Sequence, residues 1–242
     1  MQKIFSPPKS LRNIITHYCP GCGHGITQRL IAEVIDELKI REKVIGVCPV
    51  GCAVVAYDYW DFDCTEAAHG RALAVATGIK RVRPKNIVFT YQGDGDLAAI
   101  GTNETIHAAN RGEKLTAIFI NNAVYGMTGG QMAPTTLLGQ KTITTPQGRK
   151  KEKEGYPLKI SEMLAILPAV KYIARVALFS PQEVLKAKQA IKVAFENQIN
   201  NLGFSLVEVL SPCPTYWKLS PKAAMDWIKD VMIKEFPLGR IK

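Results

Sequence analysis

Residues 86–122 read NIVFTYQGDGDLAAIGTNETIHAANRGEKLTAIFINN and combine two apolar runs with a glycine-rich turn and a helix-length stretch. The runs at 86–91 and 115–121 are short and rich in Ile and Phe, which is typical of buried strands. The stretch at 97–111 between them is predicted to be helical. A strand, a helix and a second strand in this order favour two parallel strands in one sheet.

The same alternation of strands and helices extends along the rest of the chain. Short Val- and Ile-rich runs predict further strands, and apolar residues at every third or fourth position predict helices. We expect one α/β domain over residues 1–242, built on a doubly wound, mostly parallel sheet. The further strands are expected at 43–47, 172–178 and 204–210, and the further helices at 25–39, 66–81, 181–198 and 221–234.

Two of the predicted helices begin with a recognisable capping sequence. Ser180-Pro181-Gln182-Glu183 has the form of a capping box with proline in the first turn, and Ser220-Pro221 repeats the Ser-then-Pro start. Both signals place a helix boundary at the serine.

The segment at 122–158 breaks the regular pattern. It is rich in Thr, Gly, Pro and Gln and has no periodicity of a helix or a strand. A connection of this length inside a compact domain is usually functional or mobile. Its latter part, Arg149-Lys150-Lys151-Glu152-Lys153-Glu154, is expected to be a solvated turn.

Composition excludes several classes of protein. No apolar run approaches the ~18 residues that a spanning helix needs, and the start MQKIFSPPKSLRN lacks an apolar signal segment, so we expect a cytoplasmic protein. Lys and Arg outnumber Asp and Glu by 31 to 21, which suits an acidic protein partner, an anionic cofactor or a nucleic acid. Six cysteines are too few for a disulfide scaffold and indicate metal ligands or catalytic thiols.

An acidic and an amide side chain are expected to meet at one edge of the sheet. Gly93-Asp94-Gly95 follows one predicted strand, and Asn121-Asn122 ends the neighbouring strand. Taken alone, Gly-Asp-Gly is often a plain turn. The spacing of one helix and one strand, however, brings Asp94 and the Asn pair to the same sheet edge. Together with a backbone carbonyl they would form an oxygen site for Mg²⁺, completed by phosphate oxygens and water.

The cysteines suggest a second metal centre. Cys19-Pro20-Gly21-Cys22 precedes the first helix, and Cys52 and Cys213 each lie in a loop after a predicted strand. Four thiolates suit tetrahedral zinc or a [4Fe–4S] cluster, while half a zinc knuckle or a redox dithiol remain alternatives. Cys48 lies only four residues from Cys52 and competes with it as third ligand. Otherwise Cys48 and Cys64 are expected to be small buried hydrophobes.

The spacing of Gly93-Asp94-Gly95 and Asn121-Asn122 resembles that of the thiamine-diphosphate enzymes. The next residues, Ala123-Val124-Tyr125-Gly126-Met127-Thr128-Gly129-Gly130-Gln131, look like the 2-oxoacid:ferredoxin oxidoreductases, specifically their beta subunits. The resemblance implies the thiamine-diphosphate-binding fold, with 122–158 covering the cofactor. It also implies that Asp94, Asn122 and the Val124 carbonyl hold Mg²⁺, and that the cofactor is bound by Gly51, His69, Gly93, Gly95, Asp96, Tyr125, Gly126 and Thr128.

The cysteine and histidine segments carry the same resemblance. The beta subunits have a Cys-Pro-Gly-Cys-Gly start, a Gly-Cys after the next strand and a late Ser-Pro-Cys, which implies a [4Fe–4S] cluster on Cys19, Cys22, Cys52 and Cys213. Glu66–Ala72 contains the family's His-Gly-Arg segment, so His69 would orient substrate or cofactor or stabilise the developing enolate. A structural role for His69 is the alternative. His24 could lie near the diphosphate, and His17 and His107 are expected to be structural.

The resemblance further implies the reaction and its partners. It is the CoA-dependent oxidative decarboxylation of a 2-oxoacid to acyl-CoA and CO₂, with electrons passing through the cluster to ferredoxin. An alpha subunit would supply the pyrimidine-binding domain and the activating glutamate, with gamma- and delta-type subunits beside it. Ala53–Tyr57 is apolar and has no Lys or Arg to meet a second carboxylate, which favours 2-oxoisovalerate over 2-oxoglutarate or pyruvate.

Two other functions compete with this interpretation. A basic zinc-ribbon protein that binds nucleic acid would explain the charge and the first cysteine pair, but it leaves the spacing of Asp94 and Asn122 unexplained. A non-redox thiamine-diphosphate carboligase or decarboxylase would keep the magnesium site and make the cysteines incidental. We therefore expect neither a nucleic acid nor a membrane among the partners.

Overall fold

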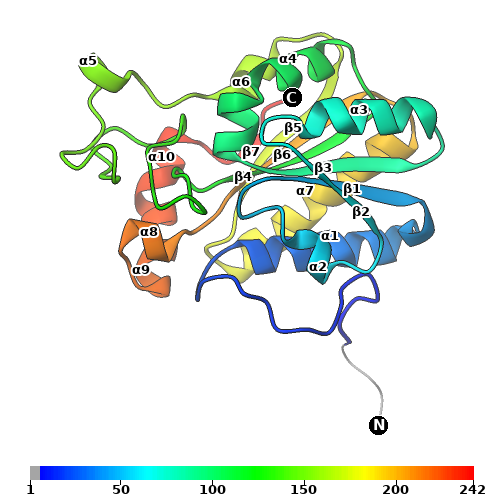
Figure 1. The fold of residues 1–242 in the computed structure, drawn as a ribbon, viewed down its shortest axis with the longest axis horizontal. Helices are drawn as coiled ribbons and strands as arrows, with labels where there is room; N and C mark the ends of the chain where they lie inside the picture. Colours follow the sequence, from blue (N-terminus) through cyan, green and yellow to red (C-terminus); the bar gives the residue numbers. More distant parts are fainter. Residues whose placement is uncertain (1–5) are drawn as a thin grey trace.

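The computed structural model describes residues 6–242 as strands and helices that alternate along the chain (Figure 1). The strands of this part are β1 (Val44–Pro49), β2 (Asp63–Ala67), β3 (Ile87–Gly93), β4 (Thr116–Asn121), β5 (Val170–Ala177), β6 (Phe204–Leu210) and β7 (Gly239–Arg240). They form one sheet in the order β2-β1-β3-β4-β6-β5-β7. Strands β1 to β6 pair in parallel, and only the short β7 is antiparallel to its neighbour β5.

Helices cover both faces of this sheet, as Figure 1 shows. The helices are α1 (His24–Leu38), α2 (Ala56–Tyr59), α3 (Ala72–Val82), α4 (Thr102–Asn110), α5 (Lys151–Glu154), α6 (Ile160–Ala165), α7 (Pro181–Ile199), α8 (Pro214–Trp217), α9 (Pro221–Trp227) and α10 (Ile233–Glu235). Short 3₁₀ or π turns lie at η1 (Arg41–Lys43), η2 (Asp96–Ile100) and η3 (Ile228–Met232). The predicted doubly wound, mostly parallel α/β fold is confirmed.

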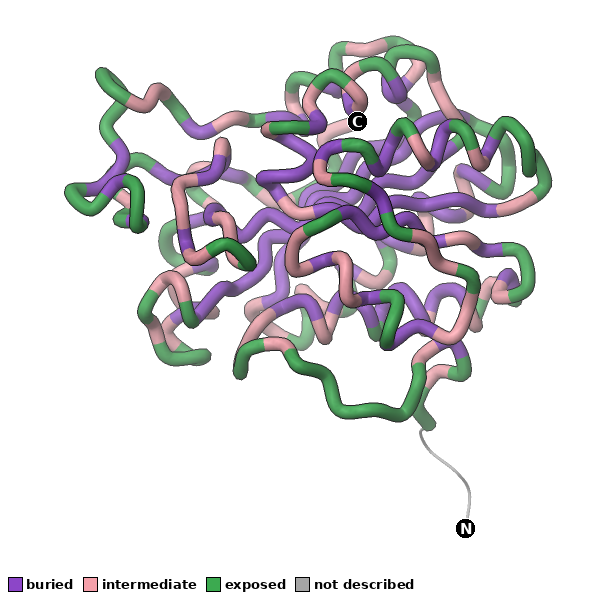
Figure 2. Tube along the Cα trace, in the orientation of Figure 1, coloured by how far each residue is buried: buried purple, intermediate pink, exposed green. Residues whose placement is uncertain are grey.

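The strands are continuous apolar runs because each central strand is buried on two sides. Within β3, Phe89 and Tyr91 pack with α1 and α7 in one buried cluster, whereas Val88 packs with α3 and α4 in another. Successive side chains of a strand point to opposite faces, so both faces need apolar residues. The buried parts of the trace therefore gather in the sheet, and the exposed parts lie on the outer loops (Figure 2).

The two capping predictions agree with the structure. The Ser180 hydroxyl accepts a hydrogen bond from the Glu183 amide at 3.3 Å, and α7 begins at the next residue, Pro181. The Ser220 hydroxyl accepts one from the Ala223 amide at 3.3 Å, and α9 begins at Pro221. Each serine thus satisfies an amide that the first helical turn leaves without a partner.

Three sequence predictions about the elements were wrong. The helix expected at 66–81 begins only at Ala72, because residues 63–67 form the edge strand β2. Strand β2 contains Asp63, Thr65 and Glu66 and is mostly outside the core, so it lacks an apolar run and is defined by its pairing with β1. The helix expected at 97–111 is divided into the π turn η2 and α4, which begins only at Thr102. The helix expected at 221–234 is interrupted by the π turn η3 between α9 and α10.

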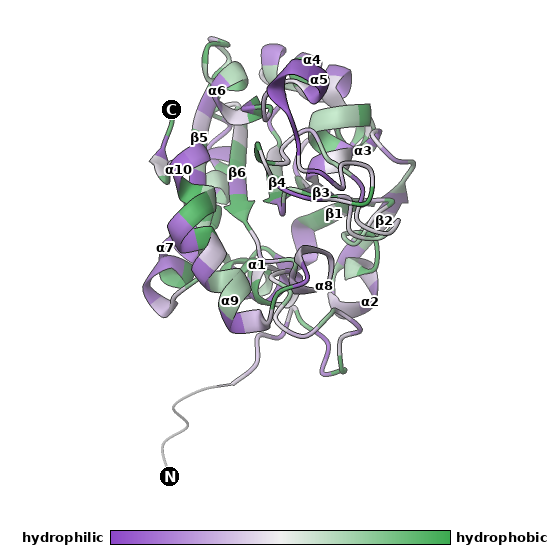
Figure 3. Cartoon of the chain, turned by 90° about the vertical axis from the view of Figure 1, so that its left-hand side faces the viewer, coloured by the Kyte–Doolittle hydropathy of each residue, from purple (hydrophilic) through white to green (hydrophobic). Residues whose placement is uncertain are grey.

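The C-terminal helices cover one end of the sheet, on the side that Figure 3 turns toward the viewer. Ile228, Met232 and Phe236 are fully buried against Ala123 and Leu210, which follow or end strands β4 and β6. This third apolar cluster attaches the C-terminal segment to the loops at the carboxyl ends of the strands. No helix within residues 6–242 is long and apolar enough to cross a membrane.

A buried ion pair connects three neighbouring strands. Glu208 on β6 accepts hydrogen bonds from Arg175 Nε on β5 at 2.8 Å, from Asn121 Nδ2 on β4 at 2.7 Å and from Ser161 Oγ on α6 at 2.5 Å. Arg175 also donates two hydrogen bonds to Glu162. Burial alone would raise the pKa of Glu162, but the hydrogen bonds and the positive charge of Arg175 lower it.

We expect Arg175→Met to lower the free energy of unfolding by about 3–5 kcal/mol, because Glu208 would remain buried without its cation. Equilibrium unfolding in urea measures this. The control is Lys222→Met, which removes a cation from an exposed pair with Asp226 and should change the midpoint little. Equal midpoints for the two variants would contradict a structural role for the buried network.

Candidate functional site

A cavity of about 560 Å³ lies at the carboxyl ends of β1, β3 and β4. This is the position at which open parallel sheets bind ligands. Its lining contains Asp94, Asn122 and Val124, the residues expected to hold Mg²⁺. It also contains every residue expected to bind the cofactor, namely Gly51, His69, Gly93, Gly95, Asp96, Tyr125, Gly126 and Thr128. The fold thus brings together residues from loops that are far apart in the sequence.

The Asp94 carboxylate is buried in the wall of this cavity. Its Oδ1 accepts a hydrogen bond from the Gly95 amide at 2.8 Å, and its Oδ2 accepts one from the Thr135 hydroxyl at 2.6 Å. Burial raises the pKa of Asp94 to about 6, although these bonds and the nearby amides of Ala123 and Val124 oppose the rise. A bound cation would stabilise the charged carboxylate in this position.

The two asparagines after β4 have different surroundings. Asn121 is fully buried, donates to Glu208 and accepts the Ala123 amide at 3.2 Å. Asn122 lines the cavity instead, and its backbone carbonyl accepts the Trp217 indole N–H at 3.0 Å. Between the two predicted ligands, Ala123 has a φ of 55°, which is uncommon for a residue with a side chain. This strained turn puts Asn122 and Val124 on the cavity side.

The oxygen atoms of this wall suit a hard cation. Mg²⁺ prefers oxygen ligands and usually keeps water and phosphate oxygens in the remaining positions. One carboxylate, one side-chain amide and one backbone carbonyl are the protein part of such a set. Within residues 6–242 no three His, Cys, Asp or Glu side chains stand together as a metal-binding group, so a site here relies on amide and carbonyl oxygens.

Two glycines of the cavity lie in close contact with neighbouring side chains. A Cβ atom on Gly95 would lie 2.0 Å from the Tyr125 ring, which packs over the turn after β3. A Cβ atom on Gly126 would lie 3.0 Å from the Cys52 sulfur. These glycines let the turns after β3 and β4 approach each other and the loop after β1, and they leave backbone at the cavity surface.

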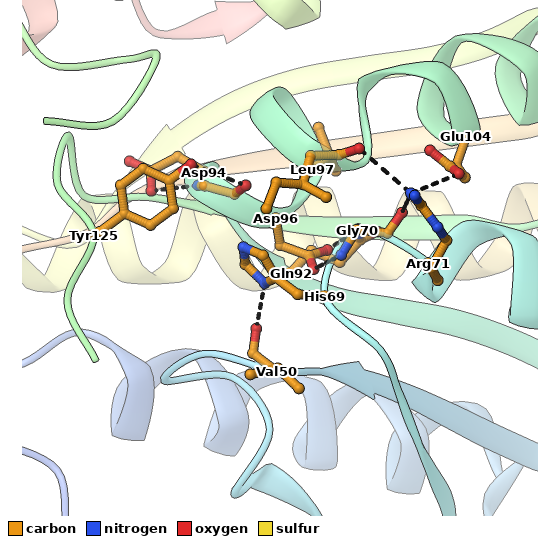
Figure 4. A network of polar contacts seen from close by, with 12 residues as sticks. Val50, His69, Gly70, Arg71, Gln92, Asp94, Asp96, Leu97, Glu104 and Tyr125 are labelled. Carbon is orange, nitrogen blue, oxygen red and sulfur yellow. Dashed lines mark hydrogen bonds and ion pairs between the residues drawn. The ribbon is translucent and has the colours of Figure 1, made fainter. Parts of the chain in front are cut away.

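His69 is held by two acceptors at the edge of the cavity, as Figure 4 shows. Its Nδ1 lies 2.8 Å from the Val50 carbonyl and 3.2 Å from Asp96 Oδ1. If Nδ1 carries the proton for these acceptors, Nε2 is left as an acceptor. Asp96 also accepts the Gly70 amide and the Gln92 side-chain amide. Its carboxylate therefore positions the His69 loop, and burial raises its pKa despite these bonds.

Four cysteines gather beside the cavity. The charges of Cys52 and Cys19 raise the pKa of Cys22, that of Cys19 raises the pKa of Cys52, and those of Cys22 and Cys52 raise the pKa of Cys213. Burial is the main cause that raises the pKa of Cys22 and Cys52 to about 11 and of Cys213 to about 12. Only Cys52 of this group lines the cavity. Because no three described side chains are already in a metal-binding arrangement, a cluster would require these thiols to draw together.

Cys48 lies against a different partner. Its pKa is raised by a side-chain contact with Cys64 on the adjacent strand β2, with burial as the second cause. Cys48 is fully buried, as expected for a small apolar residue. The structure therefore groups Cys52, and not Cys48, with the first cysteine pair.

Of the remaining histidines, His24 and His17 make local side-chain contacts. His24 lines the cavity, and its Nδ1 lies 2.6 Å from the Tyr91 hydroxyl. Burial lowers the pKa of His24 to about 4, so the ring is neutral near pH 7. His17 contacts the Tyr59 hydroxyl, and His107 lies on α4, outside the cavity lining.

The long segment after β4 lines the cavity only with its first part. Of 122–158, only residues between Asn122 and Gln131 line the cavity, and the rest packs behind the wall or extends from it. The prediction of a solvated turn at 149–154 was wrong for Arg149, which is 5% exposed. Its guanidinium donates to the backbone carbonyls of Pro134, Thr136, Glu154, Gly155 and Tyr156.

Sequence reasoning missed Thr135 and Arg149 as parts of this site. Thr135 is one of many threonines in a segment without periodicity, and Arg149 begins a run of charged residues. Neither has a local pattern that distinguishes it from its neighbours. Only the contacts across the loop reveal their roles.

Comparison with known proteins identifies relatives of this chain. The family described as "Thiamine pyrophosphate enzyme, C-terminal TPP binding domain" matches residues 49–209. Ketoisovalerate oxidoreductase subunit VorA of Methanothermobacter thermautotrophicus is 51% identical over 100% of the chain and 53% of its own length. The 2-oxoglutarate synthase subunit KorB of Archaeoglobus fulgidus is 40% identical over 89% of the chain and 76% of its own length.

A solved structure shares the fold. It is a 2-oxoglutarate:ferredoxin oxidoreductase from Magnetococcus marinus with 2-oxoglutarate, coenzyme A and succinyl-CoA bound. The TM-score is 0.76 at 28% identity, over 88% of this chain and 70% of that one. The chain spans about half the length of the VorA relatives that it matches.

Proposed function

This chain belongs to the thiamine-diphosphate-dependent 2-oxoacid:ferredoxin oxidoreductase family, and we propose that it binds Mg²⁺ and thiamine diphosphate for the oxidative decarboxylation of a 2-oxoacid. The observation that carries the proposal is the meeting of Asp94 and Asn122 in one cavity wall. They follow two different strands, β3 and β4, and Val124 lies in the same cavity wall.

The protein would hold the diphosphate through the cation and the backbone of two turns. Asp94, Asn122 and the Val124 carbonyl bind Mg²⁺ in this proposal, and Gly95, Gly126 and the Thr128 hydroxyl approach the diphosphate. When bound, thiamine diphosphate supplies the nucleophilic carbon that adds to the 2-oxo group and allows CO₂ to leave. The chain's own part is to bind, orient and shield the reacting groups.

The cysteine group would hold the electron acceptor. We assign Cys19, Cys22, Cys52 and Cys213 to a [4Fe–4S] cluster. Two hydrogen bonds that join their loops support this: the Tyr18 hydroxyl donates to the Cys52 carbonyl at 3.0 Å, and the Gly23 amide donates to the Pro212 carbonyl at 3.4 Å. Cys52 lines the cavity and belongs to the group as well, so it connects the cofactor site to the cluster. Iron would favour the thiolate forms that burial otherwise disfavours. Ferredoxin would then receive the electrons.

His69 is the chain's candidate for contact with the substrate. Its ring lines the cavity and is oriented through Nδ1 by Val50 and Asp96. In this proposal Nε2 orients the substrate or stabilises the developing negative charge. Asp96 acts through His69 and is a positioning residue.

The cavity favours a small apolar 2-oxoacid. Its described lining contains no Lys or Arg that could pair with a second carboxylate. It contains instead the apolar side chains of Val50, Ala53, Ile100, Ile120 and Met127. The relatives named ketoisovalerate oxidoreductase subunits are consistent with a branched-chain acid such as 2-oxoisovalerate. Coenzyme A would accept the acyl group.

Partner subunits complete the proposed enzyme. The glutamate that activates the cofactor and the pyrimidine-binding domain would come from an alpha subunit, with gamma- and delta-type subunits beside it. The relatives are themselves named as subunits, which supports an assembly of several chains. The apolar side chains at the cavity edge, Ile100 and Met127, are 52% and 46% exposed and are suited to contact such a partner.

We expect Asp94→Asn to weaken thiamine diphosphate binding in the presence of Mg²⁺ on the order of a hundredfold, or roughly 3 kcal/mol. The variant keeps the shape of the side chain and removes the charge that holds the cation. Calorimetric titration of the assembled complex measures the affinity. Asp226→Asn on the surface of α9 is the control and should bind as the wild type does. Unchanged binding by Asp94→Asn would refute the metal assignment.

Replacement of two nearby cysteines should separate their roles. We expect Cys52→Ser to lose most of the iron and acid-labile sulfide, whereas Cys48→Ser keeps about four iron atoms per chain. Anaerobic purification followed by iron and sulfide analysis measures this. Loss of iron from Cys48→Ser alone would reverse the assignment, and a colourless wild type that contains zinc would exclude the cluster.

The substrate proposal predicts an order of rates. With coenzyme A and ferredoxin present, the assembled enzyme should oxidise 2-oxoisovalerate with a higher kcat/KM than 2-oxoglutarate, because the cavity offers no cation for the second carboxylate. Reduction of ferredoxin under anaerobic conditions measures the rates. A preference for 2-oxoglutarate would show that groups outside this cavity determine the specificity.

A further inference from the structure

A second histidine, His24, lines the cavity with one ring nitrogen that makes no hydrogen bond. The residue is 2% exposed, and its Nδ1 lies 2.6 Å from the Tyr91 hydroxyl. Its Nε2 has no hydrogen-bond partner within residues 6–242, and it is not one of the unpartnered polar atoms that are enclosed by protein. Because His24 lines the cavity, Nε2 is open to the cavity. The roles proposed above leave this nitrogen without a function.

Aromatic neighbours hold the His24 ring in one orientation. The Tyr18 ring stacks on its face with 5.0 Å between the centroids and 9° between the planes, and the Tyr91 ring meets its edge at 5.5 Å and 81°. Tyr18 is fixed in turn, since its hydroxyl donates to the Cys52 carbonyl at 3.0 Å and accepts from Gln28 Nε2 at 2.6 Å. The imidazole is therefore held with Nε2 toward the cavity.

The Tyr91 hydroxyl determines which nitrogen of His24 carries the proton. Tyr91 is fully buried, and His24 Nδ1 is the one hydrogen-bond partner of its hydroxyl among the described residues. A buried O–H group without an acceptor is costly, so the hydroxyl donates to Nδ1. In a neutral imidazole one nitrogen accepts and the other donates. Nε2 therefore carries the proton and presents an N–H donor to the cavity.

The position of this donor favours an anionic oxygen as its acceptor. His24 is the first residue of α1, so the positive end of the helix dipole lies beside the ring. The first turn of this helix contains no acidic residue that would offset that end. The reaction proposed above brings two anionic groups into the cavity, the diphosphate of the cofactor and the carboxylate of the 2-oxoacid. Each offers an oxygen of the kind that Nε2–H lacks.

We propose that His24 donates a hydrogen bond from Nε2–H to an anionic oxygen of the molecule bound in the cavity, and that Tyr91 is a positioning residue that fixes this donor. The proposal rests on the thiamine diphosphate function inferred above. A hydrogen bond to a charged acceptor is strong and directional, so it both holds and orients the ligand. His24 and His69 thus approach the ligand from different parts of the chain, the start of α1 and the loop after β2.

The test removes the donor in His24→Phe and restores one in His24→Gln, whose amide N–H can reach a similar position. One arm titrates the assembled complex with thiamine diphosphate and Mg²⁺ in a calorimeter. The second arm titrates the cofactor-loaded complex with 2-hydroxyisovalerate, which keeps the carboxylate but has no 2-oxo group to react. We expect His24→Phe to weaken binding about 10- to 100-fold in the arm whose ligand accepts the bond, because the lost hydrogen bond is to a charged group. His24→Gln should recover most of this affinity.

Tyr91→Phe tests the positioning role. It leaves the His24 ring in place and frees Nδ1, so we expect a smaller loss, about 3- to 10-fold, in the same arm. In the His24→Gln background the same change should have no further effect, because an amide donor does not depend on a tautomer. Tyr59→Phe is the matched control, since the Tyr59 hydroxyl contacts His17 Nδ1 and neither residue lines the cavity. This control should bind both ligands as the wild type does.

Iron content and affinity together decide the outcome. Each variant should keep the wild-type iron content, so that a loss of affinity does not come from a lost cluster. Unchanged affinity of His24→Phe in both arms, or loss of iron from this variant, would overturn the role of His24. An equal effect of Tyr91→Phe in the wild-type and His24→Gln backgrounds would overturn the positioning role of Tyr91. A wild-type complex that does not bind thiamine diphosphate with Mg²⁺ would instead overturn the proposed function.

Discussion

The structure depends on the constraint that neighbouring parallel strands end at the same edge of the sheet. Cys52 follows β1, Asp94 follows β3, Asn122 follows β4 and Cys213 follows β6, and these four strands are adjacent in the sheet. Each loop therefore meets the next one in space although helices separate them in the sequence. The oxygen site and the cysteine group are two consequences of this single arrangement.

The site carries costs that a bound metal would offset. Burial disfavours the charged form of Asp94 and of the thiols at Cys22, Cys52 and Cys213, as their raised pKa values show. The turn at Ala123 adds backbone strain. Bound cations would favour the charged forms of all these side chains, so that metal binding and local stability would be linked in the proposed enzyme. Such unfavourable local features are common at functional sites and are held by the surrounding fold.

Two rigid networks supply that support. Glu208, paired with Arg175, fixes Asn121 and with it the start of the turn that carries Asn122. On the other side, Arg149 orders the loop that contacts Asp94 and Ala123 through Thr135 and Thr136. The networks lie outside the cavity, yet they position the proposed metal ligands in its wall. The long segment after β4 is thus partly a wall of the cavity and partly a support behind it.

From the sequence alone, the central strands, the helix starts at Ser180 and Ser220, and the meeting of Asp94 with Asn122 could be predicted, because each depends on a local pattern or on the spacing of one helix and one strand. Only the tertiary structure revealed the edge strand β2, the contact of Cys48 with Cys64, the hydrogen bond from Thr135 to Asp94, and the burial of Arg149. Each of these depends on contacts between residues far apart in the chain. A polar side chain gives the same sequence pattern whether it faces solvent or a buried partner. Its surroundings therefore depend on how loops from distant parts of the chain pack together.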